Sequence, residues 1–188
     1  MSYVGIDQSY GGFGLTFLKN NGQHETVVKA FGPDKYGPGV TRLVAISDWL
    51  YQELRRHELD ENIEHVCMEG YANGAKFGRE QAGELGAHVK LTIFEALPVN
   101  SSVEDARYPT IVTPTALKKF ILGKGVGGKN EILLGCYKRW GVDFRNDNAA
   151  DSYGLARMAE AIHTGTTQFA YEREVISKLT PHTERHNS

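Results

Sequence analysis

The N-terminal part of the chain carries short apolar runs separated by polar turns, a pattern that predicts three strands. Residues 3–7 form the first, which ends on Asp7, and a turn with two glycines separates it from the second at residues 13–18. An Asn-Asn-Gly tight turn at residues 20–22 then leads to a third strand around residues 26–28. Short connections of this kind join antiparallel neighbours, so we expect an opening three-stranded meander.

The rest of the chain alternates helical periodicity with two further strands. After a Gly/Pro loop over residues 32–39, apolar residues recur at helical spacing over residues 43–54 and predict a helix that ends near residue 59. The remaining predicted elements are a strand over residues 63–69, a long helix over 75–96, a polar loop over 97–108, a strand over 110–112, helices over 114–120 and 129–140 on either side of a glycine-rich loop at 123–128, and a last strong helix that starts after Asn146-Asp147-Asn148 and runs to about residue 163. This order of elements indicates an α/β fold.

The long helix predicted over residues 75–96 has small residues spaced near one face, among them Gly83 and Gly86. A glycine inside a helix costs about 1 kcal/mol relative to alanine, so the close approach of another helix should offset that cost. The second helix could belong to the same core or to a second subunit, and the pattern alone leaves both open.

Length and composition favour one domain. A chain of 188 residues can build one well-filled core. No apolar run approaches the roughly 20 residues that span a bilayer, and the N-terminus lacks a signal-peptide pattern. Cys67 and Cys136 lie apart in apolar patterns, which indicates reduced core thiols in a cytoplasmic protein. We predict a domain over residues 1–165 and a C-terminal helix or tail over 166–188, with disorder from about residue 180.

The net charge of −2 gives no sign of nucleic-acid binding, but the basic residues are unevenly distributed. Between Leu117 and Trp140 six lysines and arginines accompany a single acid, Glu131. A local basic patch of this kind can steer a polyanion even on a slightly acidic protein. A solvated helix face explains the same pattern equally well.

Carboxylates end two of the predicted strands. Asp7 and Glu69 each follow a nearly continuous apolar run, which predicts central strands whose ends lie at one edge of the sheet. A third acidic group, residues 147–151, opens the last strong helix. Three carboxylates in a partly buried site repel each other and raise one another's pKa values, and a divalent cation relieves that repulsion. Oxygen ligands suit Mg²⁺ or Mn²⁺ better than zinc.

Each acid also has a purely structural explanation. Asp7 could cap its own loop, and Glu69 could pair with a surface lysine. Asp147 or Asn148 is a good helix N-cap, and Asp151 in a first turn would interact favourably with the helix dipole. The order of strands, helices and acids along the chain is harder to explain by chance.

Four segments occur in an order that resembles one known family. They are Gly5-Ile6-Asp7 with Gly12-Phe13-Gly14-Leu15, then Met68-Glu69-Gly70-Tyr71, then the basic stretch from Leu117-Lys118-Lys119-Phe120 to Gly128-Lys129, and finally Ala149-Ala150-Asp151-Ser152-Tyr153-Gly154-Leu155-Ala156. Together they resemble the RNase H-like fold, and specifically the RuvC-type Holliday-junction resolvases and their phage relatives. The resemblance implies a mixed five-stranded sheet, flanked by helices, in which two parallel strands extend a three-stranded antiparallel meander.

By this resemblance Asp7, Glu69 and Asp151 are metal ligands. The family's fourth ligand falls at Asn148, whose amide oxygen can bind a cation but adds no charge. Asp147, one residue earlier, is the alternative. The second metal position is therefore open.

The resemblance also assigns the basic segment and one aromatic residue to DNA. Lys118 and Lys129 match basic positions near the cleaved strand, and Lys129 would act in catalysis by stabilising charge that builds during displacement. Lys119 and Lys124 belong to the same segment and are expected to bind DNA. Tyr71 is expected to contact opened bases; Phe77 could serve instead, or could belong to the core.

The implied reaction is hydrolysis of a phosphodiester with two Mg²⁺ or Mn²⁺ ions, roughly 3.5–4 Å apart, leaving a 5′-phosphate and a 3′-hydroxyl. Members of the family are homodimers that nick a four-way junction symmetrically, and the helix over residues 75–96 would form the dimer contact. We expect a cytoplasmic location, or the host cytoplasm if the chain is encoded by a phage.

Three other functions stay open. A broader branched-DNA nuclease would use the same site. A junction-binding protein with a degraded site fits the uncharged Asn148. An actin-like phosphotransferase shares the Gly-Ile-Asp opening, but such folds duplicate the domain and need a second phosphate loop with an acid that residues 123–128 lack.

Overall fold

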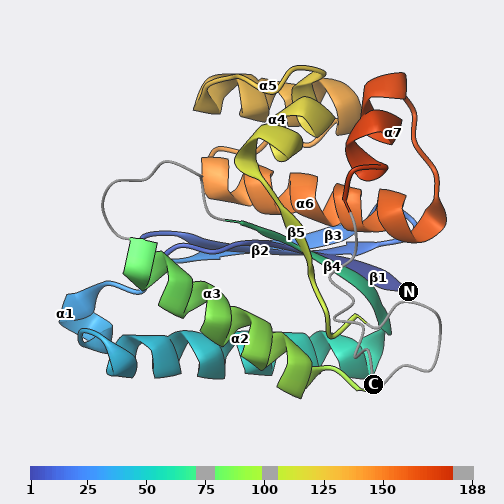
Figure 1. Ribbon diagram of the computed structural model, residues 1–188. Helices are drawn as coiled ribbons and strands as arrows, with labels where there is room; N and C mark the ends of the chain where they lie inside the picture. The colour runs from blue at the N-terminus through green and yellow to red at the C-terminus, as the bar shows by residue number, and fades with distance from the viewer. Residues whose placement is uncertain (71–78, 99–105, 180–188) are drawn as a thin grey trace, which may run out of the picture.

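A five-stranded mixed sheet forms the centre of the molecule, in a computed structural model that describes residues 1–70, 79–98 and 106–179 (Figure 1). Its strands are β1 (Ser2–Asp7), β2 (Phe13–Lys19), β3 (His24–Lys29), β4 (Ile63–Glu69) and β5 (Thr110–Val112). They lie in the order β3-β2-β1-β4-β5. The β1–β2 and β2–β3 pairs are antiparallel, whereas β1–β4 and β4–β5 are parallel. The predicted meander with two added parallel strands is confirmed.

Helices cover both faces of the sheet (Figure 1). They are α1 (Pro33–Tyr36), α2 (Val40–Asp60), α3 (Arg79–Ala96), α4 (Pro114–Leu122), α5 (Lys129–Trp140), α6 (Asp147–Thr164) and α7 (Ala170–Ile176). One face is covered by α2 and α3, and the other by α6, with α4, α5 and α7 packed beyond it.

One helix near the sheet edge differs from the prediction. Residues 32–39, predicted as a loop, contain the single turn α1, because Pro33 has the fixed φ that suits a first helical position and needs no N–H partner there. Helix α3 is described from Arg79 to Ala96, and its end agrees with the predicted end at residue 96. The predicted start of the long helix at residue 75 lies outside the described residues.

The start of α6 also differs from the prediction. Asn146 is the N-cap, and its side-chain oxygen accepts a hydrogen bond from the Ala149 backbone N–H at 3.2 Å. Asp147 and Asn148 therefore lie in the first turn of α6, and the prediction that one of them caps the helix is wrong. Asp151 follows in the second turn, so its interpretation as a first-turn residue is also wrong.

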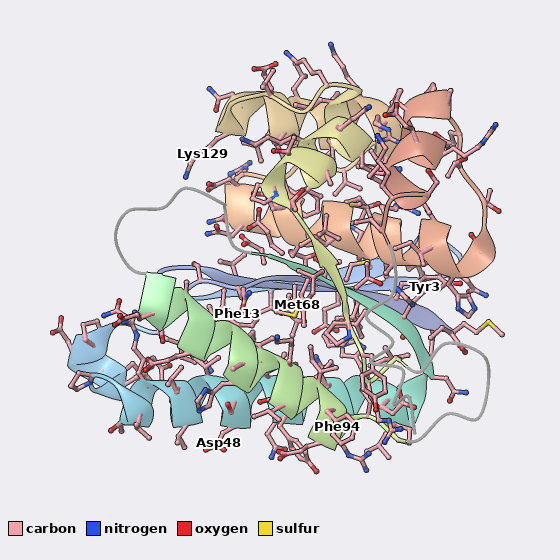
Figure 2. All side chains as sticks on the ribbon, in the orientation of Figure 1. Tyr3, Phe13, Asp48, Met68, Phe94 and Lys129 are labelled. Carbon is pink, nitrogen blue, oxygen red and sulfur yellow. The ribbon has the colours of Figure 1, made fainter. Side chains whose placement is uncertain are left out.

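The sheet separates two apolar cores because successive side chains of a strand point to opposite faces. Val4 and Ile6 of β1 belong to the core shared with α2 and α3, together with Phe13 and Met68 (Figure 2). Tyr3 of the same strand belongs to the core formed with α6. The central strand is buried on both faces, as its continuous apolar run predicts.

Two glycines allow α6 to lie directly on the sheet. A Cβ atom at Gly5 would overlap the carbonyl oxygen of Ser152, and one at Gly14 would overlap the carbonyl oxygen of Asn148. The Ser152 hydroxyl is also hydrogen-bonded at 2.9 Å to the hydroxyl of Thr16 on β2. Backbone contact and this buried polar pair together fix α6 against β1 and β2, and thereby fix the position of its first turns.

The C-terminal helix α7 packs against α4, and Val175 joins the core on the α6 face. The boundary predicted at residue 165 stays a prediction, and the predicted disorder from residue 180 falls outside the described residues. Among the helices described in residues 1–70, 79–98 and 106–179, none combines the length and apolar character needed to cross a membrane.

Candidate active site

Three acids from separate elements meet at one edge of the sheet. Asp7 ends β1 and Glu69 ends β4, and these strands are parallel neighbours in which Ile6 pairs with Met68. The two carboxyl groups therefore leave the sheet at the same edge. Asp151 approaches from α6, the helix that lies directly over β1. The three residues act electrostatically on one another, as predicted from their positions in the sequence.

Burial sets the electrostatics of this edge. Asp7 is only 5 % exposed. Burial raises the pKa of Asp7 to about 9, with further contributions from the charge of Glu69, a hydrogen bond to Glu69 and the charge of Asp151. Burial also raises the pKa of Glu69, although its hydrogen bond to Asp7 works in the opposite direction. For Asp151, burial and the charges of Glu69 and Asp147 raise the pKa to about 7.

Two of the predicted lysines lie close enough to act on these acids. The positive charge of Lys118 lowers the pKa values of both Glu69 and Asp151, against the larger effect of burial. Lys129 begins α5, and its exposed ammonium forms an ion pair with Asp147 on the side of the molecule where α6 begins (Figure 2). Asp151 and Asp7 add smaller attractive contributions to the raised pKa of Lys129. Both lysines therefore border the acidic site.

The two alternatives for a fourth ligand occupy different surroundings. Asn148 lies against the turn after β1, where a Cβ on Gly12 would overlap its side-chain amide. Asp147 is held by the ion pair with Lys129, whose hydrogen bond lowers the pKa of Asp147. Asn148 therefore lies beside the loop that follows Asp7, and Asp147 lies beside the basic helix.

Two other lysines named from the sequence form ion pairs with acids outside this group. Lys119 pairs at 2.8 Å with Glu174 of α7. Lys124 forms an ion pair with Glu131 in its own segment. Tyr71 falls outside the described residues, and its contact with DNA bases stays a prediction.

Gln8 belongs to this edge and was not anticipated from the sequence. Its side-chain N–H donates a hydrogen bond of 2.9 Å to the backbone carbonyl of Glu69, which ties the ends of β1 and β4 together. Its side-chain oxygen is buried and lacks a hydrogen-bond partner among the described residues. The only sequence signal was its place directly after Asp7.

The carboxylate oxygens of Asp7, Glu69 and Asp151 are suitable ligands for a hard divalent cation, but their present arrangement would have to change for a cation to bind. Partly buried carboxylates that repel one another are stabilised in their charged form by Mg²⁺ or Mn²⁺, because these cations prefer oxygen ligands. As they stand, no three His, Cys, Asp or Glu side chains within the described residues are grouped to hold a metal ion. Cation binding would therefore require the side chains of Asp7, Glu69 and Asp151 to move closer together as Asp7 loses its proton.

Comparison with solved structures gives two similar folds. The structure of RuvC from Thermus thermophilus has a TM-score of 0.64 and 21 % sequence identity, over 88 % of this chain and 98 % of that one. The structure of T. thermophilus RuvC in complex with a Holliday junction substrate has a TM-score of 0.65 and 17 % identity, over 96 % of this chain and 99 % of that one.

Sequence comparisons give no match. No protein-family model matches the chain, and no curated protein matches it. The likeness is therefore one of three-dimensional structure across nearly the whole chain. Together with the observed strand order, it confirms the predicted fold: this chain has the RNase H-like fold of the RuvC structures.

Proposed function

We propose that this protein is a divalent-cation-dependent DNA endonuclease that resolves four-way junctions by paired symmetric nicks. One observation carries the proposal: Asp7, Glu69 and Asp151 meet at one sheet edge with raised pKa values, in a fold shared with a protein solved on a Holliday junction. Holding three mutually repulsive acids in a partly buried site is costly to stability, and such sites are typical of function rather than of folding.

Asp7, Glu69 and Asp151 would hold the cations, and the lysines would act on the DNA strand. When bound, two Mg²⁺ ions supply an activated water and neutralise the leaving 3′ oxygen. Lys118 lies near Glu69 and Asp151 and would hold the phosphate being cleaved. Lys129 is exposed at the start of α5, where its ammonium can leave Asp147 and bind a phosphate oxygen while the phosphodiester is hydrolysed. Asp7 is buried, whereas Glu69 and Asp151 remain partly exposed.

Asn148 is our choice for the fourth ligand. Its amide lies beside Gly12, in the loop that connects Asp7 to β2. Asp147 already has a cationic partner in Lys129. An amide oxygen brings no charge, so the cation that it helps to hold should be the weaker of the two.

A second copy of the chain is the proposed partner at α3. Leu91, Phe94 and Tyr108 are exposed apolar residues that line a groove over α3 and the segment before β5, and Arg107 stacks over the Phe94 ring at 4.8 Å. Large apolar side chains gathered on one surface are typical of a protein interface. Gly86 of the same helix is buried, so its small size serves the core of the subunit. The homodimer would place two sites on one junction.

The test is cleavage of a labelled four-way junction with and without Mg²⁺. The unmodified protein should make paired symmetric nicks only with Mg²⁺, and Asp7→Asn should bind the junction but cleave on the order of a thousandfold more slowly. Asp48→Asn, which removes an exposed acid of α2 (Figure 2), is the matched control and should cleave normally. Equal cleavage by both variants would exclude Asp7 from the site.

The remaining readings correspond to other outcomes of the same experiment. Linear duplex cleaved as fast as the junction would indicate a broader debranching nuclease. Junction binding without nicks at any cation concentration would indicate a binding protein with an inactive site. Tight ATP binding without DNA cleavage would indicate a phosphotransferase. A phage origin stays a prediction.

A further inference from the structure

A second group of cations lies on the side of the sheet away from the predicted basic segment. Lys29 ends β3, Lys35 lies in α1 and Arg42 lies in the first turn of α2. We refer to Lys29, Lys35 and Arg42 as the second basic surface. Across the described residues, none of these three side chains forms an ion pair with an acid.

Aromatic rings, rather than carboxylates, hold these cations in place. The Lys29 ammonium lies 5.1 Å from the ring centroid of Trp49 and 5.2 Å from that of Phe31. The guanidinium of Arg42 lies 4.1 Å from the ring centroid of Tyr10, and its Nε–H donates to the Phe31 carbonyl. A ring face attracts a cation without neutralising its charge. These two cations are therefore fixed in position and still able to attract an anion.

The lysines named from the sequence are in the opposite situation. Apart from Lys118, each has its charge matched by a carboxylate of the same chain. These ion pairs join Lys119 to Glu174, Lys124 to Glu131 and Lys129 to Asp147. A phosphate must displace the internal acid before it can bind such a lysine, whereas Lys29 and Arg42 can bind a phosphate without that exchange.

Strand register places this surface at the same sheet edge as the acids. Asp7 pairs with Gly14, and Gly14 pairs with Val28, the residue before Lys29. Strands lie about 4.8 Å apart, so the end of β3 is about 10 Å from the end of β1. Figure 1 shows α1 and the start of α6 on the same side of the molecule, on opposite faces of the sheet. DNA seated at the acids would therefore pass close to the second basic surface.

We propose that the second basic surface binds backbone phosphates of the DNA arm next to the cleaved bond; this inference rests on the proposed nuclease function. Phosphates are favoured over bases because Lys29 and Arg42 cover the ring faces on which a base would stack. The contact is electrostatic and independent of base sequence. It holds the arm on one side of the acids, while Lys118 and Lys129 hold the strand on the other.

The experiment measures junction binding as a function of salt, with Ca²⁺ in place of Mg²⁺ to prevent cleavage. Lys29→Gln, Lys35→Gln and Arg42→Gln are prepared singly and together. Lys19→Gln is the matched control, because Lys19 pairs with Glu61 at 2.7 Å at the far end of β2. Melting temperatures identify any variant that is poorly folded, and the exposed Lys35 keeps the test valid if Arg42 is needed for folding.

Each removed cation should reduce the slope of log K against log salt by about one, and the triple variant should bind on the order of a hundredfold more weakly at about 0.1 M salt. Lys19→Gln should keep the slope and affinity of the unmodified protein. An unchanged slope in the folded triple variant, or an equal loss in Lys19→Gln, would overturn the inference. Failure of the unmodified protein to cleave the junction in Mg²⁺ would instead count against the proposed function.

Discussion

The carboxyl group of Asp7 is hydrogen-bonded to the carboxylate of Glu69, across two parallel strands. The bond raises the pKa of Asp7 and opposes the effect of burial, which raises the pKa of Glu69, so a proton shared by the pair favours Asp7. Without a cation, the two carboxyl groups titrate as a coupled pair, and Asp7 keeps its proton at neutral pH. The same pair would bind a cation by giving up that proton.

This arrangement predicts how stability without divalent cations depends on pH. The pKa values of Asp7 and Asp151 in the folded protein, about 9 and about 7, lie above the ordinary value of 3.8. Protons therefore bind the folded state more tightly, so stability is fully present below about pH 4 and is lost as pH rises through 7 and then 9. Asp7→Asn removes the part of this loss that comes from Asp7 and should raise the free energy of unfolding at pH 8 by about 1–2 kcal/mol.

Urea unfolding in EDTA at pH 5 and pH 8 provides the measurement. The difference between Asp7→Asn and the unmodified protein should be larger at pH 8 than at pH 5, whereas Asp48→Asn should track the unmodified protein at both. A variant that is less stable than the unmodified protein at pH 8 would contradict the raised pKa of Asp7. Saturating Mg²⁺ should stabilise the unmodified protein more than the Asp7→Asn variant.

The choice of fourth ligand predicts a gain of function. Asn148→Asp keeps the shape of the side chain beside Gly12 and adds a negative charge, so half-maximal cleavage should need several-fold less Mg²⁺. Asn148→Ala should need more. A Mg²⁺ titration of cleavage rate distinguishes Asn148 from Asp147 as the ligand. If the Mg²⁺ concentration for half-maximal cleavage rose more in Asp147→Asn than in Asn148→Ala, the ligand would be Asp147.

Lys118 should control the pH profile of cleavage. Its charge lowers the pKa values of Glu69 and Asp151, so Lys118→Gln should shift the acidic limb of the rate profile to higher pH. The maximal rate should also fall on the order of a hundredfold, because a phosphate contact is lost. Lys178→Gln removes an exposed lysine paired with Glu174 and serves as the control. A lower rate with an unshifted pH profile would show that Lys118 does not lower the pKa values of Glu69 and Asp151.

The sequence predicted which residues end β1 and β4, because neighbouring residues along the chain decide where a strand ends. Asp7 and Glu69 were found because each ends an apolar run, and parallel pairing then brings the two strand ends together. The ion pair of Lys119 with Glu174 could not be predicted, because it joins α4 to a helix that follows much later in the chain. The second basic surface could not be predicted for the same reason, because folding brings Trp49 beside Lys29 and Tyr10 beside Arg42 from distant parts of the sequence. Gln8 is a similar case, since its hydrogen bond crosses from β1 to β4.

The contact of α6 with β1 predicts a change that damages the site from a distance. In Gly5→Ala the new methyl group would overlap the backbone of Ser152, so α6 must move away from the sheet and carry Asp151 with it. We expect a loss of about 2–4 kcal/mol in the free energy of unfolding and a lower affinity for Mg²⁺ in the fraction that folds. Gly11→Ala is the matched control, because a Cβ there meets no atom within 4 Å. Urea unfolding and Mg²⁺ titration measure both effects. If Gly5→Ala bound Mg²⁺ as tightly as Gly11→Ala, the position of Asp151 would not depend on the close contact between α6 and β1.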